Sequence, residues 1–90
     1  MATVFVPPLM QKLTNDKPTV EISGKTVREV IANLEAAYPG TKARIVDGFK
    51  IKSNISVAVD GEVTPIGMLE KVKEDSEVHF LPAIGGGYSA

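Results

Sequence analysis

Apolar and polar residues alternate along parts of the chain, and this pattern predicts short β-strands. Residues 3–6 form a β-branched and aromatic run that ends at Pro7-Pro8, which favours a first strand. Residues 19–23 alternate with a period of two, which is typical of a strand with one buried face. The intervening residues 9–18 are polar and contain Asn15-Asp16, so we expect a turn or loop between the two strands.

A helical spacing replaces the alternation after residue 25 and predicts the main helix. Thr26 followed by Glu29 forms a capping box, in which each side chain can bind a free backbone amide of the first turn. One apolar stripe follows, made of Val27, Val30, Ile31, Leu34 and Tyr38. Pro39-Gly40 ends the helix, because a residue before proline avoids the helical conformation.

The second half of the chain predicts two further strands and two short connections. The apolar positions of residues 41–52 suit either a short helical turn or a loop packed on the sheet. Residues 55–59 read as a strand, and Asp60-Gly61 after it is a strong hairpin signal. The return strand from Glu62 is cut short by Pro65, and residues 66–72 suit a short turn of helix covering the sheet.

The last strand is predicted at residues 77–81, after a turn at Glu74-Asp75. Runs of strands with one long helix indicate an α+β domain, with a mixed sheet and the helix packed across one face. The first and last strands can lie side by side and parallel in its middle, as in a β-grasp fold, because the whole intervening chain supplies the crossover. We therefore expect one domain over residues 1–82 and a flexible glycine tail over residues 83–90.

Composition narrows the class of protein. The 90 residues carry a net charge of -1, and a nucleic-acid binder would need a basic face instead. No apolar stretch reaches membrane-spanning length, and the N-terminus lacks the features of a secretory signal. With no cysteine there is neither a thiolate metal site nor a thiol nucleophile. We expect a cytoplasmic protein that binds neither nucleic acid nor membrane.

The body of the domain offers no convincing catalytic group. His79, the only histidine, lies opposite Val78 and Phe80 in an alternating strand, so we expect it at the surface. Asp60 is explained by turn geometry, and neither it nor Glu62 belongs to a metal-binding pattern. We expect no catalytic residue, no metal and no bound cofactor.

Other conspicuous residues also have simple structural explanations. Met68 is expected to fill the core. The connection after the helix is locally basic, and its cations are either solvated or face a complementary acidic partner. These cations are Lys42, Arg44, Lys50 and Lys52.

The most distinctive feature is the run Pro82-Ala83-Ile84-Gly85-Gly86-Gly87, which follows directly from the last strand. It is not a phosphate loop, because neither Lys-Ser/Thr nor a helix follows it. Glycine has no Cβ, so such a run can enter a channel that is too narrow for other residues. From Pro82 to Gly87 the chain reaches roughly 20 Å at about 3.3 Å per residue. The run is therefore either slack or an arm that inserts into a partner.

The order of elements and three local patterns resemble the MoaD/ThiS family of ubiquitin-like sulfur carriers. The patterns are the Gly-x-Thr-Val-x-x-Val-Ile-x-x-Leu run from Gly24 to Leu34, Asp60-Gly61-Glu62, and the ending from Glu77 to Gly87. Leu-Pro-Ala-Ile before the glycines is most similar to carriers of the cysteine-biosynthesis (CysO-like) type, with the small subunit of molybdopterin synthase second. The resemblance implies a β-grasp fold and a protein co-substrate rather than an enzyme.

The resemblance also implies a mechanism and partners. An E1-like adenylyltransferase would use ATP to adenylate the carboxylate of Gly87, and a sulfur donor would convert it to a thiocarboxylate. Residues 82–86 would be the inserted arm, namely Pro82, Ala83, Ile84, Gly85 and Gly86. The sulfur acceptor would be a cysteine synthase-like enzyme that uses pyridoxal phosphate (PLP), or the large subunit of molybdopterin synthase. Docking would use the exposed sheet face near the last strand, with Phe80 or His79 contributing.

Residues beyond Gly87 distinguish this chain from carriers that end at the diglycine. Because Tyr88-Ser89-Ala90 follow, we expect a protease to cut between Gly87 and Tyr88, with a JAMM-type metalloprotease as the candidate. Gly86 is the alternative mature terminus. Two other functions stay open: a ubiquitin-like modifier that forms isopeptide bonds, and a β-grasp interaction module whose tail is slack.

Overall fold

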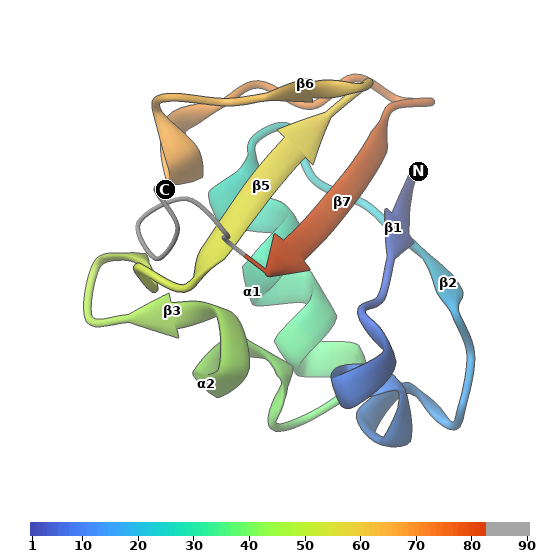
Figure 1. Ribbon diagram of the computed structural model, residues 1–90. Coiled ribbons are helices and arrows are strands. Elements are labelled where there is room, and N and C mark those ends of the chain that lie inside the picture. Colours follow the sequence, from blue (N-terminus) through green and yellow to red (C-terminus); the bar gives the residue numbers. More distant parts are fainter. Residues whose placement is uncertain (83–90) are drawn as a thin grey trace.

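The computed structural model describes residues 1–82, which form a five-stranded mixed sheet, a separate two-stranded hairpin and one main helix (Figure 1). The order of strands in the sheet is β2-β1-β7-β5-β6. Its members are β1 (Ala2–Phe5), β2 (Thr19–Ile22), β5 (Ile55–Val59), β6 (Glu62–Val63) and β7 (Glu77–Pro82). Helix α1 (Val27–Ala37) lies across one face of this sheet. The expected tail, residues 83–90, lies outside the described residues, so the domain boundary stays a prediction.

The first and last strands are parallel neighbours in the middle of the sheet, as the sequence predicts. Val4 of β1 is in register with Val78 of β7, and Phe5 is in register with His79. β7 is also antiparallel to β5, which pairs Val57 with Phe80. Because β7 is bonded on both sides, the strand that leads to residue 83 is held firmly in place.

Helix α1 begins as the capping box predicts, with one change. The side chain of Thr26 accepts a hydrogen bond of 3.2 Å from the backbone N–H of Glu29. The Glu29 carboxylate in turn accepts from the N–H of Lys25, one residue before the cap, at 2.9 Å. The predicted stripe faces the sheet, and its fully buried members are Val27, Val30, Ile31 and Leu34.

Gly24 allows the end of β2 to pass close to α1. Its φ is +153°, and a Cβ placed on it would lie 2.7 Å from the backbone nitrogen of Val30 and 2.8 Å from the Val30 Cγ2. Real Cβ atoms do not approach other atoms so closely. The glycine at the start of the helix pattern is therefore required by packing.

The core lies between α1 and the sheet. Its strand residues come from one face of each strand, in agreement with the alternation. They include Ala2, Val4, Val20, Ile22, Val57, Val78 and Phe80. Among residues 1–82, no helix covers the other face of the sheet (Figure 1).

The connection that the sequence left ambiguous divides into two elements. Residues Thr41–Ile45 form the short helix α2, which confirms the helical alternative for this part. A hairpin follows, with β3 (Val46–Asp47) paired to β4 (Lys50–Ile51). Its turn points Phe49 outward, and this side chain is 96 % exposed. Of the two alternatives for residues 41–52, a loop packed on the sheet therefore does not hold at Phe49.

Two short 3-10 helices form where the sequence predicted other structures. A loop was predicted at the first and a longer helix at the second. Residues Pro8–Thr14 form η1, where a loop was expected, because Met10 and Thr14 turn inward and are buried. Thr14 satisfies its buried hydroxyl by donating to the backbone carbonyl of Lys17 at 2.9 Å. The helix expected over residues 66–72 is shortened to η2 (Gly67–Leu69), and only Met68 of its side chains packs partly against the core.

No helix among residues 1–82 has the length and apolar character needed to cross a membrane.

Candidate functional site

The uncovered face of the sheet presents one row of side chains that crosses all five strands. Strand pairing aligns one residue from each strand, and residues paired in neighbouring strands share a face. The row consists of Thr19, Phe5, His79, Ala58 and Val63. We call this face, with Leu81, the open face.

A stacked pair of rings occupies the middle of the open face. The rings of Phe5 and His79 have centroids 4.0 Å apart and planes within 7° of parallel. The His79 Nε2 lies 3.9 Å from a carboxylate oxygen of Glu77, which is beyond hydrogen-bonding distance. The prediction that His79 faces away from the core is confirmed, and its ring acts as part of an apolar surface.

The apolar part of the open face extends toward the end of β7. Leu81 lies two residues beyond His79 on the same face and is 40 % exposed. Ser56 opposes it on β5, and Pro82 pairs with Ile55 at the end of the strand. Leu81 therefore adds one exposed apolar side chain to the open face, beside the polar Ser56, between the Phe5–His79 pair and the end of β7.

The opposite end of the open face is acidic. Glu21 accepts a hydrogen bond of 2.8 Å from the hydroxyl of Thr3. Glu77 lies on the same face, and Glu74 beyond it binds the N-terminal ammonium at 2.8 Å. This hydrogen bond and the nearby positive charge lower the pKa of Glu74. The face is thus polar at one end, with an apolar surface at the end that leads to the tail.

Asp60 does more than form the expected turn. With φ values of +53° for Asp60 and +88° for Gly61, the predicted hairpin turn is confirmed. The Asp60 carboxylate also accepts from the backbone N–H of Glu77 at 2.9 Å and from the hydroxyl of Ser76 at 2.8 Å. These hydrogen bonds, the Glu77 one foremost, lower the pKa of Asp60. The carboxylate ties the β5–β6 turn to the start of β7.

The structure corrects one predicted contact residue and adds others. Phe80 is only 2 % exposed and belongs to the core, so it cannot dock a partner from the open face. Phe80 is buried because it follows His79 directly in β7, and successive residues of a strand point to opposite faces of the sheet. Phe5, Val63 and Leu81 also lie on the open face, and none of them was predicted as a candidate from the sequence. Alternation within each strand could have placed Phe5 and Leu81 on the outward face. Which residues of other strands lie beside them depends on how the strands pair.

The remaining candidate residues do not form a catalytic or metal site. No group of three or more metal-binding side chains gathers within residues 1–82. Glu62 is exposed on β6, and Met68 is half-buried against the core rather than within it. Among the basic residues, Arg44 is exposed and Lys52 half-buried, while Lys42 and Lys50 border a groove beside α1.

The predicted reactive segment lies almost wholly outside the described residues. Pro82 is the last of them and ends β7. The other candidates are beyond it, and their assignments stay predictions. They are the predicted arm Ala83, Ile84, Gly85 and Gly86, the reactive Gly87, and the cleavage position between Gly87 and Tyr88.

Comparison with known proteins gives a consistent match over nearly the whole chain. The model of the ThiS family matches residues 5–87. The sulfur carrier protein CysO of Mycobacterium tuberculosis (strain H37Rv) is 30 % identical over 90 residues, which cover 94 % of this chain and 97 % of that protein. The same protein of Mycobacterium bovis matches equally well.

Solved structures agree with this match. A chain of the Amycolatopsis orientalis BexX/CysO complex superposes with a TM-score of 0.89 at 33 % identity, covering 92 % of this chain and 96 % of that one. Mycobacterium tuberculosis CysO gives a TM-score of 0.88 at 28 % identity, with coverage of 92 % and 99 %. The small archaeal modifier protein 1 of Methanosarcina acetivorans gives 0.78 at 21 % identity, covering 96 % and 95 %, and shares the fold. These similarities confirm the ubiquitin-like β-grasp fold.

Proposed function

The chain belongs to the ThiS family of sulfur carriers, and we propose that it carries sulfur as a thiocarboxylate on the α-carboxyl group of Gly87. Members of this family are protein co-substrates and not enzymes. Catalysis then belongs to the partner enzymes. The observation that carries the proposal is the apolar open face that leads from the Phe5–His79 pair to the start of the tail.

The chemistry needs two substitutions, the first at the α-phosphorus of ATP and the second at the carboxyl carbon of Gly87. The Gly87 carboxylate attacks the α-phosphorus of ATP on an E1-like adenylyltransferase, which releases pyrophosphate and leaves an acyl adenylate. A sulfur donor then displaces AMP and leaves the thiocarboxylate. Gly85 and Gly86 suit this role, because a chain without Cβ atoms can enter a narrow active site. Activation by ATP favours a cytoplasmic location.

The tail can reach an active site while the open face stays docked. Its residues 82–87 span roughly 20 Å when extended at about 3.3 Å per residue. β7 is hydrogen-bonded to both β1 and β5, so the arm would leave from a rigid base. Leu81 and His79 beside that base would contact the surface around the partner's cleft.

Activation requires a free carboxyl group on the terminal glycine. In this chain Tyr88-Ser89-Ala90 follow Gly87, whose carboxyl is therefore part of a peptide bond. We infer that a protease, of which a JAMM-type metalloprotease is the candidate, cuts between Gly87 and Tyr88. If the cut falls one residue earlier, Gly86 becomes the reactive terminus.

The acceptor we propose is a PLP-dependent, cysteine synthase-like enzyme. The support is the similarity to CysO proteins at 30 % identity and the Leu-Pro-Ala-Ile sequence before the glycines. A CysO also occurs in a complex with BexX, which supports direct docking of such a carrier on a partner protein. The large subunit of molybdopterin synthase is the alternative acceptor.

Reconstitution would test the proposal. Three chains, ending at residues 86, 87 and 90, would be incubated with an E1-like activating enzyme, ATP and sulfide, and their intact masses measured. We expect only the chain ending at Gly87 to gain the mass that corresponds to replacing one oxygen by sulfur. If only the 86-residue chain gains this mass, the reactive terminus is Gly86 rather than Gly87. If no chain gains sulfur, the carrier function is refuted.

A further inference from the structure

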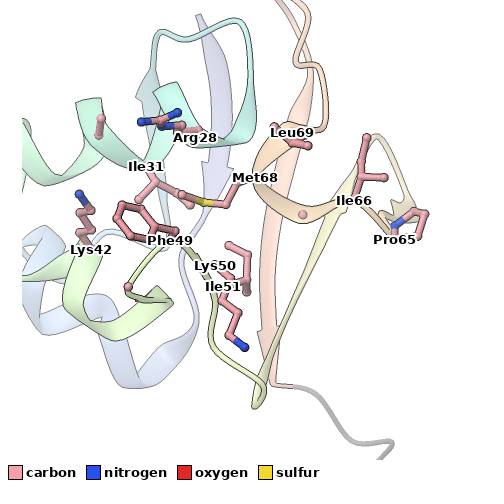
Figure 2. Close-up of a pocket in the computed structure, with 13 residues that line it drawn as sticks. Arg28, Ile31, Lys42, Phe49, Lys50, Ile51, Pro65, Ile66, Met68 and Leu69 are labelled. Carbon is pink, nitrogen blue, oxygen red and sulfur yellow. The ribbon is translucent and has the colours of Figure 1, made fainter.

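A groove lies on the helical side of the sheet, away from the open face. It runs between α1, the turn of the β3–β4 hairpin and η2, and has a volume of about 700 Å³ (Figure 2). Lys42 and Phe49 lie on one side of the view, and Leu69, Ile66 and Pro65 lie on the other. Three segments that are far apart in the sequence therefore build one concave surface.

Apolar side chains make both the floor and the walls of this groove. Ile31, Ile51 and Met68 form the floor, and all three pack in or against the core. Phe49 and Leu69 rise from opposite walls and are 96 % and 71 % exposed. Large apolar side chains are often exposed singly, but several around one concavity mark an interaction site.

The rim of the groove carries positive charge. Arg28, Lys42 and Lys50 line it, and none of its lining residues is acidic. Within residues 1–82, no carboxylate lies within 4.0 Å of these three cationic groups. The Glu35 carboxylate accepts from the backbone N–H groups of Gly40 and Lys42, at 3.1 and 2.9 Å. This carboxylate is therefore engaged with backbone at the start of α2. The groove is locally basic in a chain whose net charge is -1.

We propose that this groove binds a segment of a partner protein that carries apolar side chains flanked by carboxylates. An apolar centre with a polar rim is the usual composition of a protein–protein interface. A small-molecule site would instead enclose its ligand and fix it by a few rigid polar groups. Here the polar groups are long, flexible cations at the rim, which select an acidic partner.

Binding at the groove leaves the open face free. α1 covers the face of the sheet opposite to the Phe5–His79 pair, so a segment seated beside α1 does not cover that pair. The carrier can therefore engage a second protein while its open face is docked on an activating enzyme. The groove proposal is independent of the chemistry proposed for Gly87, so an experiment can refute either proposal without refuting the other.

A selection from a phage-displayed library of random linear peptides, with the full chain as bait, would test the groove. Counter-selection would use the variant Phe49→Ser/Leu69→Ser, whose changes are at exposed positions. A charge variant, Lys42→Glu/Lys50→Glu, removes the basic rim. The matched control is Leu9→Ser/Lys12→Glu on η1, where Leu9 is 87 % exposed and neither residue lines the groove. Amide spectra would verify that each variant is folded.

We expect enriched peptides to combine apolar anchors with Asp or Glu, and to shift the amide signals of Phe49 and Leu69. Each groove variant should weaken their binding at least about tenfold, the control less than about twofold, and added salt should weaken binding. Thiocarboxylate formation by the groove variants should equal that of the control. Peptides without acidic residues, peptides that shift only Phe5 and His79, or no groove-dependent peptide would overturn the proposal.

Two other occupants have distinct signatures. If the chain's own tail fills the groove, Ile84→Ser/Tyr88→Ser will shift the groove amides without any peptide. If a second copy fills it, the same signals will shift as protein concentration rises. Either result would overturn the proposal and identify the tail or a second copy of the chain as the occupant of the groove.

Discussion

The rings of Phe5 and His79 lie nearly parallel and in contact across β1 and β7, with their centroids 4.0 Å apart, on the face of the sheet opposite to α1. The two strands are at opposite ends of the sequence and become neighbours only in the folded sheet. The pair therefore marks the centre of the open face, on the strand whose end leads to residue 83. Its energetic coupling can be measured.

A double-mutant cycle with Phe5→Ala and His79→Ala should give a coupling energy of about 0.5–1.5 kcal/mol in the free energy of unfolding. Stacked aromatic rings gain this much beyond the area they bury. Urea denaturation of the four proteins supplies the values. Phe5→Ala with Val63→Ala is the control cycle, since two strands separate these residues, and it should be additive to within about 0.5 kcal/mol. Additivity of both cycles would show that the stack contributes nothing.

Leu81→Ser should weaken productive docking on the activating enzyme and leave the fold intact. Leu81 is 40 % exposed beside the start of the tail. We expect Leu81 to belong to the minority of contact residues whose truncation costs about 1 kcal/mol or more, so the KM for adenylation should rise about fivefold with little change in kcat. Leu9→Ser changes the same residue type on η1, outside the open face, and serves as the control. Equal KM values for the two variants would exclude Leu81 from the interface.

Gly24→Ala should destabilise the domain by about 2 kcal/mol or more, because the new methyl group would overlap the backbone and side chain of Val30. Gly61→Ala is the matched control. It also has a positive φ, +88°, but a Cβ there meets no atom within 4 Å. Its cost should be limited to about 1 kcal/mol of backbone strain. Thermal or urea unfolding would compare the two, and similar losses would refute the steric explanation.

Stability should depend on the ionisation of Asp60. Hydrogen bonds from Glu77 and Ser76 lower its pKa in the folded protein below the ordinary value of 3.8. A lowered pKa means that the carboxylate stabilises the fold fully above the unfolded-state pKa. This stabilisation is lost as pH falls through the folded-state pKa.

The variant Asp60→Asn isolates this contribution, since asparagine tolerates the left-handed turn conformation but does not ionise. The stability difference between the natural chain and the variant should be constant near neutral pH. It should shrink as pH falls below about 4. Unfolding measurements over a pH series would give the difference, and a carbon NMR titration would give the pKa of Asp60 directly. A difference that is independent of pH would contradict the assignment.

Local sequence signals predicted the elements whose conformation depends on near neighbours. The Thr26–Glu29 cap and the apolar stripe predicted α1, because a helix is formed by contacts three and four residues apart. Asp60-Gly61 predicted the hairpin, because its residues adopt positive φ. In contrast, η1 and the β3–β4 hairpin were missed. Met10 and Phe49 look alike in polarity, and only packing decides that one is buried and the other exposed.

The sequence by itself determined which residues of each strand share a face, because alternation follows from the geometry of an extended chain. Alternation alone places His79 and Phe80 on opposite faces of the sheet. The proposed contribution of Phe80 to docking was nevertheless wrong. Only the tertiary structure decided that Phe5, His79, Ala58 and Val63 align in one row, since strand register depends on pairing between distant segments. The basic groove has the same origin, because α1, the hairpin turn and η2 meet only when the core forms.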